Sequence, residues 1–252
     1  MGGAIRILDL FPDVYLDEFK EDLADRRSLA EYLERQTNGA VTLETVFVDK
    51  GNASIEDMYD EALAAPYVLQ KVKWAETNGF HAVVVDCFID VALDAARELV
   101  EIPVMGACQS SCSLAARLGG RFSVLCVLPD MDRPIRANLA KYGLIGNLVS
   151  IRSVNVPVLD LRKDAGRRIA EEAKKAVLSD GACTLVLGCT GMSPIAKTLR
   201  QELVENGLDV PVIEPLRAAV YDALNCVLLG VSHSKASYLP VKPKHRVLDW
   251  EP

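Results

Sequence analysis

The chain has 252 residues, of which 50% are hydrophobic and 25% are charged, and its formal net charge at pH 7 is −7. This length and composition allow a sizeable apolar core, and the negative charge argues against nucleic acid or an anionic membrane surface as a partner. No apolar run of transmembrane length and no signal peptide are recognisable, so we expect a cytoplasmic protein.

Strand and helix patterns alternate along the whole chain, which is typical of a parallel α/β fold. The expected strands cover residues 5–10, 41–48, 82–87, 104–105, 122–128, 149–154, 184–189 and 210–213. The expected helices cover residues 16–35, 55–77, 91–99, 110–118, 133–142, 161–179, 194–205 and 216–229.

The order of these elements repeats. Strand, helix, strand, helix, cysteine-tipped strand, helix and short strand fill residues 5–106, and the same order recurs over residues 121–215. We therefore predict two pseudo-symmetric lobes, each a parallel sheet flanked by helices, with the active site in the cleft between them. The first lobe comprises residues 1–106 plus 214–252, and the second comprises residues 107–213.

Two near-identical segments mark the most informative positions of the repeat. They are Val83-Val84-Val85-Asp86-Cys87-Phe88 and Leu185-Val186-Leu187-Gly188-Cys189-Thr190-Gly191. Each is an apolar run that ends at a cysteine, and open α/β sheets place their sites at the carboxyl ends of such strands. Two lobes built in this way can direct two thiols at one carbon atom from opposite sides. Moving a proton from one face of that carbon to the other requires this arrangement.

The residues around each cysteine fit proton transfer. The amides at a helix start are unpaired and favour a thiolate, which lowers the pKa of a thiol below its usual ~8.5 and lets it act as a general base. The same amides can hold a carboxylate or a developing enolate oxygen. The candidate amides belong to Phe88, Ile89, Thr190 and Gly191, and Gly188 leaves room for a substrate.

Inert packing is the competing interpretation for any one of the seven cysteines. An odd number of cysteines in apolar segments favours reduced thiols over a disulfide framework. We expect Cys126, Cys183 and Cys226 to be packing residues. Cys108 and Cys112 have no second pair nearby to complete a zinc site, so no metal is expected.

An ordered set of motifs over residues 5–240 resembles the aspartate/glutamate/hydantoin racemase superfamily, and within it hydantoin and allantoin racemases. The motifs include Cys87-Phe88-x-Asp90, Ile102-Pro103-Val104, Arg133-Pro134-Ile135, Leu185-Val186-Leu187-Gly188-Cys189-Thr190-Gly191-Met192 and Pro211-Val212-Ile213. The resemblance implies a cofactor-independent two-base racemase of a small molecule, with Cys87 and Cys189 as the acid–base pair. It also implies a homo-oligomer.

Position 191 indicates the branch of the superfamily. Glutamate racemases typically carry histidine at this position and aspartate racemases often carry glutamate, whereas Gly191 resembles the hydantoin type. The implied substrate is a 5-substituted hydantoin or a related cyclic ureide such as allantoin, and the implied reaction is racemisation or epimerisation.

Two positions depart from the hydantoin-type pattern. Enzymes of that type usually carry Asn-Pro-Asn-Thr after the first strand, and here only Pro12 of that motif remains, followed by Asp13. Asp13 either faces a substrate N–H or caps the following helix, and we favour the cap. Gln109 replaces a frequent glutamate and either lines the site or begins a helix.

Other functions remain open from the sequence. An aspartate-type amino-acid racemase would need cations for a second carboxylate, and Arg133, Arg152 and Arg217 are the candidates. A decarboxylase or isomerase of a small diacid would need only one cysteine. A small-molecule-binding regulatory protein would need no reactive thiol.

Four residues outside the motifs also carry predictions. For His233 a structural role is favoured, and Tyr59, Trp74 and Tyr142 are expected in the core or an interface.

Overall fold

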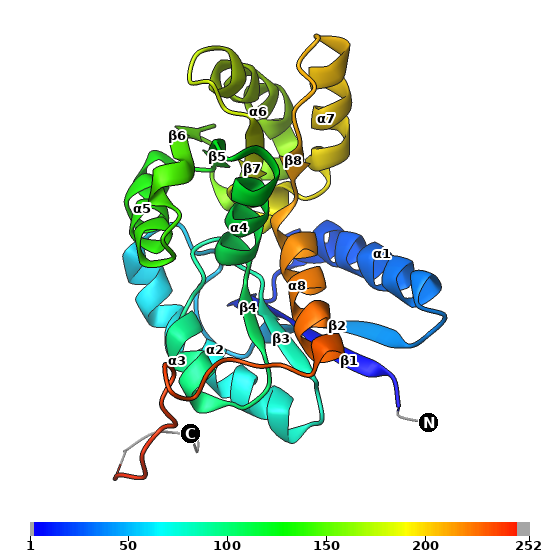
Figure 1. The fold of residues 1–252 in the computed structure, drawn as a ribbon, viewed down its shortest axis with the longest axis vertical. Helices are drawn as coiled ribbons and strands as arrows, with labels where there is room; N and C mark the ends of the chain where they lie inside the picture. Colours follow the sequence, from blue (N-terminus) through cyan, green and yellow to red (C-terminus); the bar gives the residue numbers. More distant parts are fainter. Residues whose placement is uncertain (1–2, 246–252) are drawn as a thin grey trace.

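A computed structural model describes residues 3–245, which form two four-stranded parallel sheets with flanking helices, as predicted (Figure 1). The strand order of the first sheet is β2-β1-β3-β4 and that of the second is β6-β5-β7-β8, so the second repeats the topology of the first. Residues 1–2 and 246–252 of the predicted first lobe lie outside the described residues. The strands are β1 (Ile5–Val14), β2 (Val41–Val48), β3 (Ala82–Val85), β4 (Val104–Gly106), β5 (Phe122–Cys126), β6 (Leu148–Ser153), β7 (Thr184–Leu187) and β8 (Val212–Ile213).

The helices follow the predicted order and differ from the prediction only at their ends. Polar side chains fix some of these ends: Asp57 accepts hydrogen bonds from the first amides of α2, and Glu214 does the same for α8. Gly230, with a φ of +66°, ends α8. The helices are α1 (Lys20–Gln36), α2 (Met58–Thr77), α3 (Leu93–Leu99), α4 (Ala107–Gly119), α5 (Asp132–Lys141), α6 (Leu161–Leu178), α7 (Ile195–Glu205) and α8 (Pro215–Leu229).

Both faces of the first sheet are covered, which explains its unbroken apolar strands. Alternate residues of β3 face opposite layers: Val84 packs in one cluster with Ala219 of α8, and Val83 packs in another with Val68 of α2. Every residue of β3 and of β7 is buried. No helix among residues 3–245 is both long enough and apolar enough to cross a bilayer.

Each sheet has a topological switch point, where two adjacent strands connect to opposite edges of the sheet. In the first sheet β1 connects to β2 at one edge and β3 connects to β4 at the other edge, so the switch point lies between β1 and β3. The equivalent point in the second sheet lies between β5 and β7. Crevices beyond the carboxyl ends of strands at such points bind ligands in α/β proteins. Cys87 and Cys189 each come two residues after a strand that borders one of these points.

The first strand is longer than its sequence predicts. β1 pairs with β2 through Phe11 and Phe47, and the pairing resumes only at Val14 and Val48, so Pro12 and Asp13 form a bulge. The predicted strand ends at residue 10, whereas the bulge accommodates Pro12, which has no N–H to donate to the ladder. The prediction that Asp13 caps the next helix is wrong, since neither α1 nor the short 3-10 turn before it has a side-chain cap.

Candidate active site

Both candidate cysteines line one cavity of about 310 Å³ between the two sheets. Its volume lies at the lower end of the range that is usual for small-molecule sites, roughly 300–1,000 Å³. Cys87 and Cys189 are half-buried, so their side chains reach the cavity. Six other residues predicted for the site line the same cavity, namely Asp13, Phe88, Ile89, Gly188, Thr190 and Gly191. Pro12 lies buried in the bulge and is not among the lining residues, which corrects its assignment.

The turn after Cys87 is held by the buried carboxylate of Asp90. This carboxylate accepts hydrogen bonds from the amides of Cys108 (2.8 Å) and Gln109 (2.9 Å) at the start of α4, and from the hydroxyl of Tyr142 (2.8 Å). Asp90 has a φ of +56°, a conformation that costs energy for a residue other than glycine. The three donors therefore hold a strained turn that fixes the position of Cys87.

The turn after Cys189 also connects the two sheets. The hydroxyl of Thr190 donates to the backbone oxygen of Asp86 at 3.4 Å, so the residues next to the two cysteines touch across the cleft. A Cβ atom at Gly191 would lie 3.6 Å from the Cys189 sulfur, so any side chain at this position would enter the cavity. The absence of a side chain at position 191 therefore enlarges the space beside the thiol.

Gly188 has a packing role in addition to the one predicted. A Cβ atom there would lie 2.8 Å from the backbone oxygen of Leu125 and 2.8 Å from Cγ1 of Val124. Glycine at this position therefore permits close packing of β7 against β5, while the residue also lines the cavity.

Burial raises the pKa of both thiols, contrary to the expectation from the helix starts. It raises the pKa of Cys189 to about 12. Burial followed by the charge of Asp13 raises the pKa of Cys87 well above its ordinary value. The amides of Ile89 and Gly191 donate to the two sulfurs and oppose these shifts, but desolvation is larger. Both sulfurs are therefore protonated at neutral pH in the site described by the structure.

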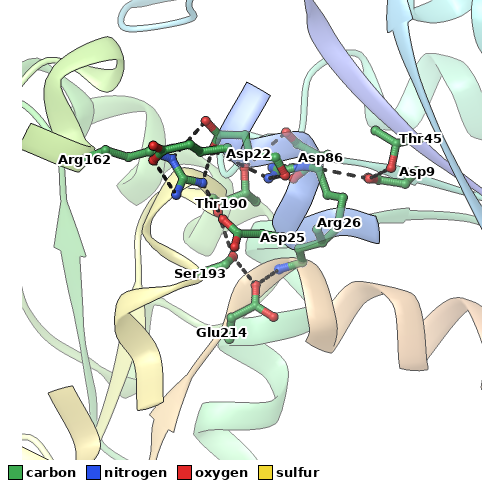
Figure 2. A network of polar contacts seen from close by, with 12 residues as sticks. Asp9, Asp22, Asp25, Arg26, Thr45, Asp86, Arg162, Thr190, Ser193 and Glu214 are labelled. Carbon is green, nitrogen blue, oxygen red and sulfur yellow. Dashed lines mark hydrogen bonds and ion pairs between the residues drawn. The ribbon is translucent and has the colours of Figure 1, made fainter. Parts of the chain in front are cut away.

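A buried arginine organises the carboxylates behind the cavity (Figure 2). The guanidinium of Arg26 in α1 lies 2.6 Å from Oδ2 of Asp86 and 3.8 Å from Oδ2 of Asp9, and all three side chains are at most 1% exposed. It also lies over the ring of Phe11, 4.7 Å from the ring centroid. Asp86 immediately precedes Cys87, so this ion pair ties the cysteine turn to α1. Burial and the neighbouring Asp86 raise the pKa of Asp9 well above its ordinary value, while Arg26 and the hydrogen bond from Thr45 oppose the shift.

The sequence analysis missed Arg26. Its place on a buried helix face is the signal that indicates it. The buried residues of α1 are Asp22, Arg26, Leu29 and Leu33, which follow helical spacing. A charged pair on an otherwise apolar face indicates a buried partner elsewhere in the chain.

Carboxylates outnumber cations around the cavity. The acidic lining residues are Asp13, Glu18, Glu21, Asp22 and Asp86. The cationic lining residues are Arg162 and Lys163. Arg162 lies at the start of α6 and reaches across the cleft to Asp22 (3.1 Å) and to Asp25 of α1 (Figure 2). Lys163 pairs with Asp160 at 2.8 Å. Both cations therefore already have acidic partners.

None of the three arginines proposed for an amino-acid substrate lines the cavity. Arg152 binds Asp180 at 2.6 Å and Glu172 at 3.0 Å. Arg133 and Arg217 line other surface hollows. The cations that a second substrate carboxylate would need are therefore placed elsewhere.

Two polar residues left open by the sequence have structural contacts. Gln109 lies at the start of α4 and accepts a hydrogen bond from Arg97 at 2.6 Å. His233 hydrogen-bonds the backbone of Val104, as its expected structural role implies, and burial lowers its pKa to about 4.

Tyr59 is 70% exposed and Trp74 is 37% exposed, so neither lies in the core of the single chain. Cys183 is exposed, so the expectation that it is a packing residue is wrong. Tyr142, by contrast, packs against the larger core cluster.

Comparisons with known proteins agree with the resemblance in the sequence. The family model described as Asp/Glu/Hydantoin racemase matches residues 26–223. The chain is 40% identical to the hydantoin racemase of Pseudomonas sp. (strain NS671) over 188 residues, which cover 73% of this chain and 74% of that protein. It is 33% identical to the hydantoin racemase of Paenarthrobacter aurescens over 214 residues, which cover 83% of this chain and 89% of that protein. The solved allantoin racemase from Klebsiella pneumoniae superposes with a TM-score of 0.87 at 29% identity, covering 98% of this chain and 97% of that one.

Proposed function

The chain belongs to the Asp/Glu/hydantoin racemase family, and we propose that it racemises or epimerises a 5-substituted hydantoin or a related cyclic ureide such as allantoin, without a cofactor. One observation carries the proposal: two thiols from the two sheets share a cavity whose charged lining groups are mostly carboxylates. The similar hydantoin racemases and the similar allantoin racemase structure support the same substrate class.

Cys87 and Cys189 act as the two bases. One of them, as the thiolate, takes the proton from C5 of the substrate, and the electron pair of the broken C–H bond moves onto the adjacent carbonyl oxygen. The other thiol then gives its proton to the opposite face of C5 and becomes the thiolate. Backbone amides of the two turns, including those of Phe88 and Thr190, stabilise the enolate oxygen. The reverse reaction exchanges the roles of the two cysteines.

The charge of the cavity favours this substrate over an amino acid. A hydantoin ring carries amides and no carboxylate, so it can approach Asp22 and Asp86 without like-charge repulsion. Aspartate would bring two carboxylates to a site whose lining cations, Arg162 and Lys163, are already paired. A diacid substrate for decarboxylation or isomerisation would meet the same repulsion.

Single substitution of each cysteine tests the proposal. Cys87→Ala and Cys189→Ala should each lower racemisation by about 10²–10⁴-fold or more, because each removes one acid–base group. In deuterium oxide, each variant should still exchange the C5 proton of only one enantiomer, and the two variants should act on opposite enantiomers. Polarimetry and proton NMR measure the two activities.

Cys183→Ala is the matched control, because Cys183 is exposed and outside the cavity. It should keep the wild-type rate. Full racemisation by either site variant would refute the two-base mechanism. An unreactive wild-type protein that binds a hydantoin tightly would favour the regulatory alternative.

A further inference from the structure

The bulge in β1 places one carboxyl group in the cavity wall. Asp13 is one of the two residues that β1 inserts between its pairings with Phe47 and Val48 of β2. Its side chain lines the cavity together with Cys87, yet the residue is only 6% exposed. Bulges beside active sites commonly re-aim a side chain in this way.

The surroundings of Asp13 do not support a negative charge. Its Oδ1 is buried and has no hydrogen-bond partner among residues 3–245. The titratable and charged groups that face it are Asp86 and Cys87 after β3, Arg26 on α1, Glu56 before α2 and Asp60 on α2. Three of these are carboxylates.

The one cation in this group is already engaged. Arg26 donates a hydrogen bond from Nε to Oδ2 of Asp86 (2.7 Å), its Nη2 lies 2.6 Å from the same oxygen in an ion pair without hydrogen-bond geometry, and the side chain makes no hydrogen bond to Asp13. An ionised Asp13 would thus be a buried anion with neither a donor nor an unshared counter-charge. Burial, followed by the charges of Asp86, Asp60 and Glu56, accordingly raises the pKa of Asp13 to about 8.

We propose that Asp13 is a neutral carboxylic acid at pH 7 and that it recognises the cis-amide edge of a cyclic ureide substrate. This inference rests on the proposed function and specifies how the same site selects its substrate class. A neutral carboxyl group offers one O–H donor and one C=O acceptor side by side, whereas an ionised one only accepts. An amide in a five-membered ring presents its N–H and C=O on one edge, so the two groups form a pair of hydrogen bonds. An α-amino acid has no such edge.

The dependence of KM on pH gives the kinetic test. Wild-type KM for a 5-substituted hydantoin should stay constant up to pH 7 and be about tenfold higher at pH 9, because only the neutral form of Asp13 offers both groups. Asp13→Asn retains a donor and an acceptor but cannot ionise, so the rise should disappear. Ionisation of the substrate itself changes the KM of both proteins equally. The difference between their pH dependences of KM therefore reports the ionisation of Asp13. Identical pH dependences would overturn the inference.

Removing the hydrogen bonds gives the binding test. Asp13→Ala should raise KM about 10- to 100-fold at pH 7 with a much smaller change in kcat. Methylation of the paired ring nitrogen should weaken binding to the wild type and cause little further loss in Asp13→Ala, because both changes remove the same contact. Additive losses would show that Asp13 does not contact the ring and would overturn the assignment.

A direct titration separates this inference from the proposed function. In protein labelled with ¹³C at the aspartate carboxyl carbons, the resonance missing from Asp13→Asn should titrate near pH 8, and a transition near 3.8 would overturn the inference. Asp60→Asn should move the transition to lower pH, because it removes one of the facing negative charges. Normal racemisation with an ionised Asp13 would refute this inference alone. A wild-type protein that racemises no ureide but has a neutral Asp13 would refute both the proposed function and the proposed hydrogen bonds between Asp13 and the substrate. The inference that Asp13 is neutral at pH 7 would then remain supported.

Discussion

Replacement of Arg26 by methionine tests whether the buried ion pair stabilises the fold. The substitution removes a guanidinium 2.6 Å from Asp86 and leaves that carboxylate, whose side chain is 0% exposed, without its counter-charge. Breaking a buried pair in this way costs about 3–5 kcal/mol. The lost contact with the ring of Phe11, which is also buried, contributes about 2 kcal/mol of this. We therefore expect the free energy of unfolding to fall by about 3–5 kcal/mol, a large part of the roughly 5–15 kcal/mol typical of a folded protein.

Urea unfolding followed by circular dichroism and tryptophan fluorescence measures this loss. Arg136→Met is the matched control, because it removes an exposed pair with Asp132 on the surface of α5 and should cost less than about 1 kcal/mol. Adding Asp86→Asn to Arg26→Met should recover part of the stability, since the isolated charge disappears. A loss for Arg26→Met no greater than that of the control, or no recovery in the double variant, would refute the reasoning.

Three further predictions concern the site and its supports. Gly106→Ala would place a Cβ atom 2.4 Å from the carboxyl group of Asp90. We therefore expect the free energy of unfolding, measured with urea, to fall by about 1–3 kcal/mol and the activity to fall as well. An unchanged stability and activity would contradict this. Iodoacetamide at pH 7 should alkylate the exposed Cys183 before Cys189, because the pKa of Cys189 is raised to about 12. Mass spectrometry measures the two labelling rates. Faster labelling of Cys189 would refute the raised pKa of Cys189. Because the native carboxyl of Asp13 keeps its proton to about pH 8 and the unfolded one loses it near 3.8, wild-type stability should fall relative to Asp13→Asn by up to about 4 kcal/mol between pH 4 and pH 7. Parallel stability curves for these two proteins would contradict the last prediction.

The sequence predicts those parts of the fold that local patterns determine. The runs Ala82–Val85 and Thr184–Leu187 are apolar because both faces of each strand are covered, so the strands and the cysteines that follow them could be located without coordinates. The shared strand order of the two sheets follows from the repeated order of elements.

What the sequence does not predict depends on partners distant in the chain. The bulge at Asp13 is defined by pairing with β2, more than 30 residues later, so the predicted strand stops at residue 10. The partner of Arg26 lies 60 residues away, and helical spacing alone does not identify it. The packing role of Gly188 depends on Leu125 of the neighbouring strand, which the local sequence does not indicate. The pKa of each thiol depends on burial, which here exceeds the local effect of the helix-start amides.

The raised pKa values of the thiols and the acidic cavity have a common consequence for catalysis. A thiol with a pKa of about 12 gives a thiolate that is strongly basic, which suits removal of a proton from carbon, but only a small fraction is ionised at neutral pH. Each further negative charge in the cavity would reduce that fraction, and a carboxylate substrate would add one. A neutral ureide adds none, and a protonated Asp13 removes one from the vicinity of Cys87. If the chain acts on a cyclic ureide as proposed, the electrostatic condition that permits a thiolate to form is the same condition that favours an uncharged ring as the substrate.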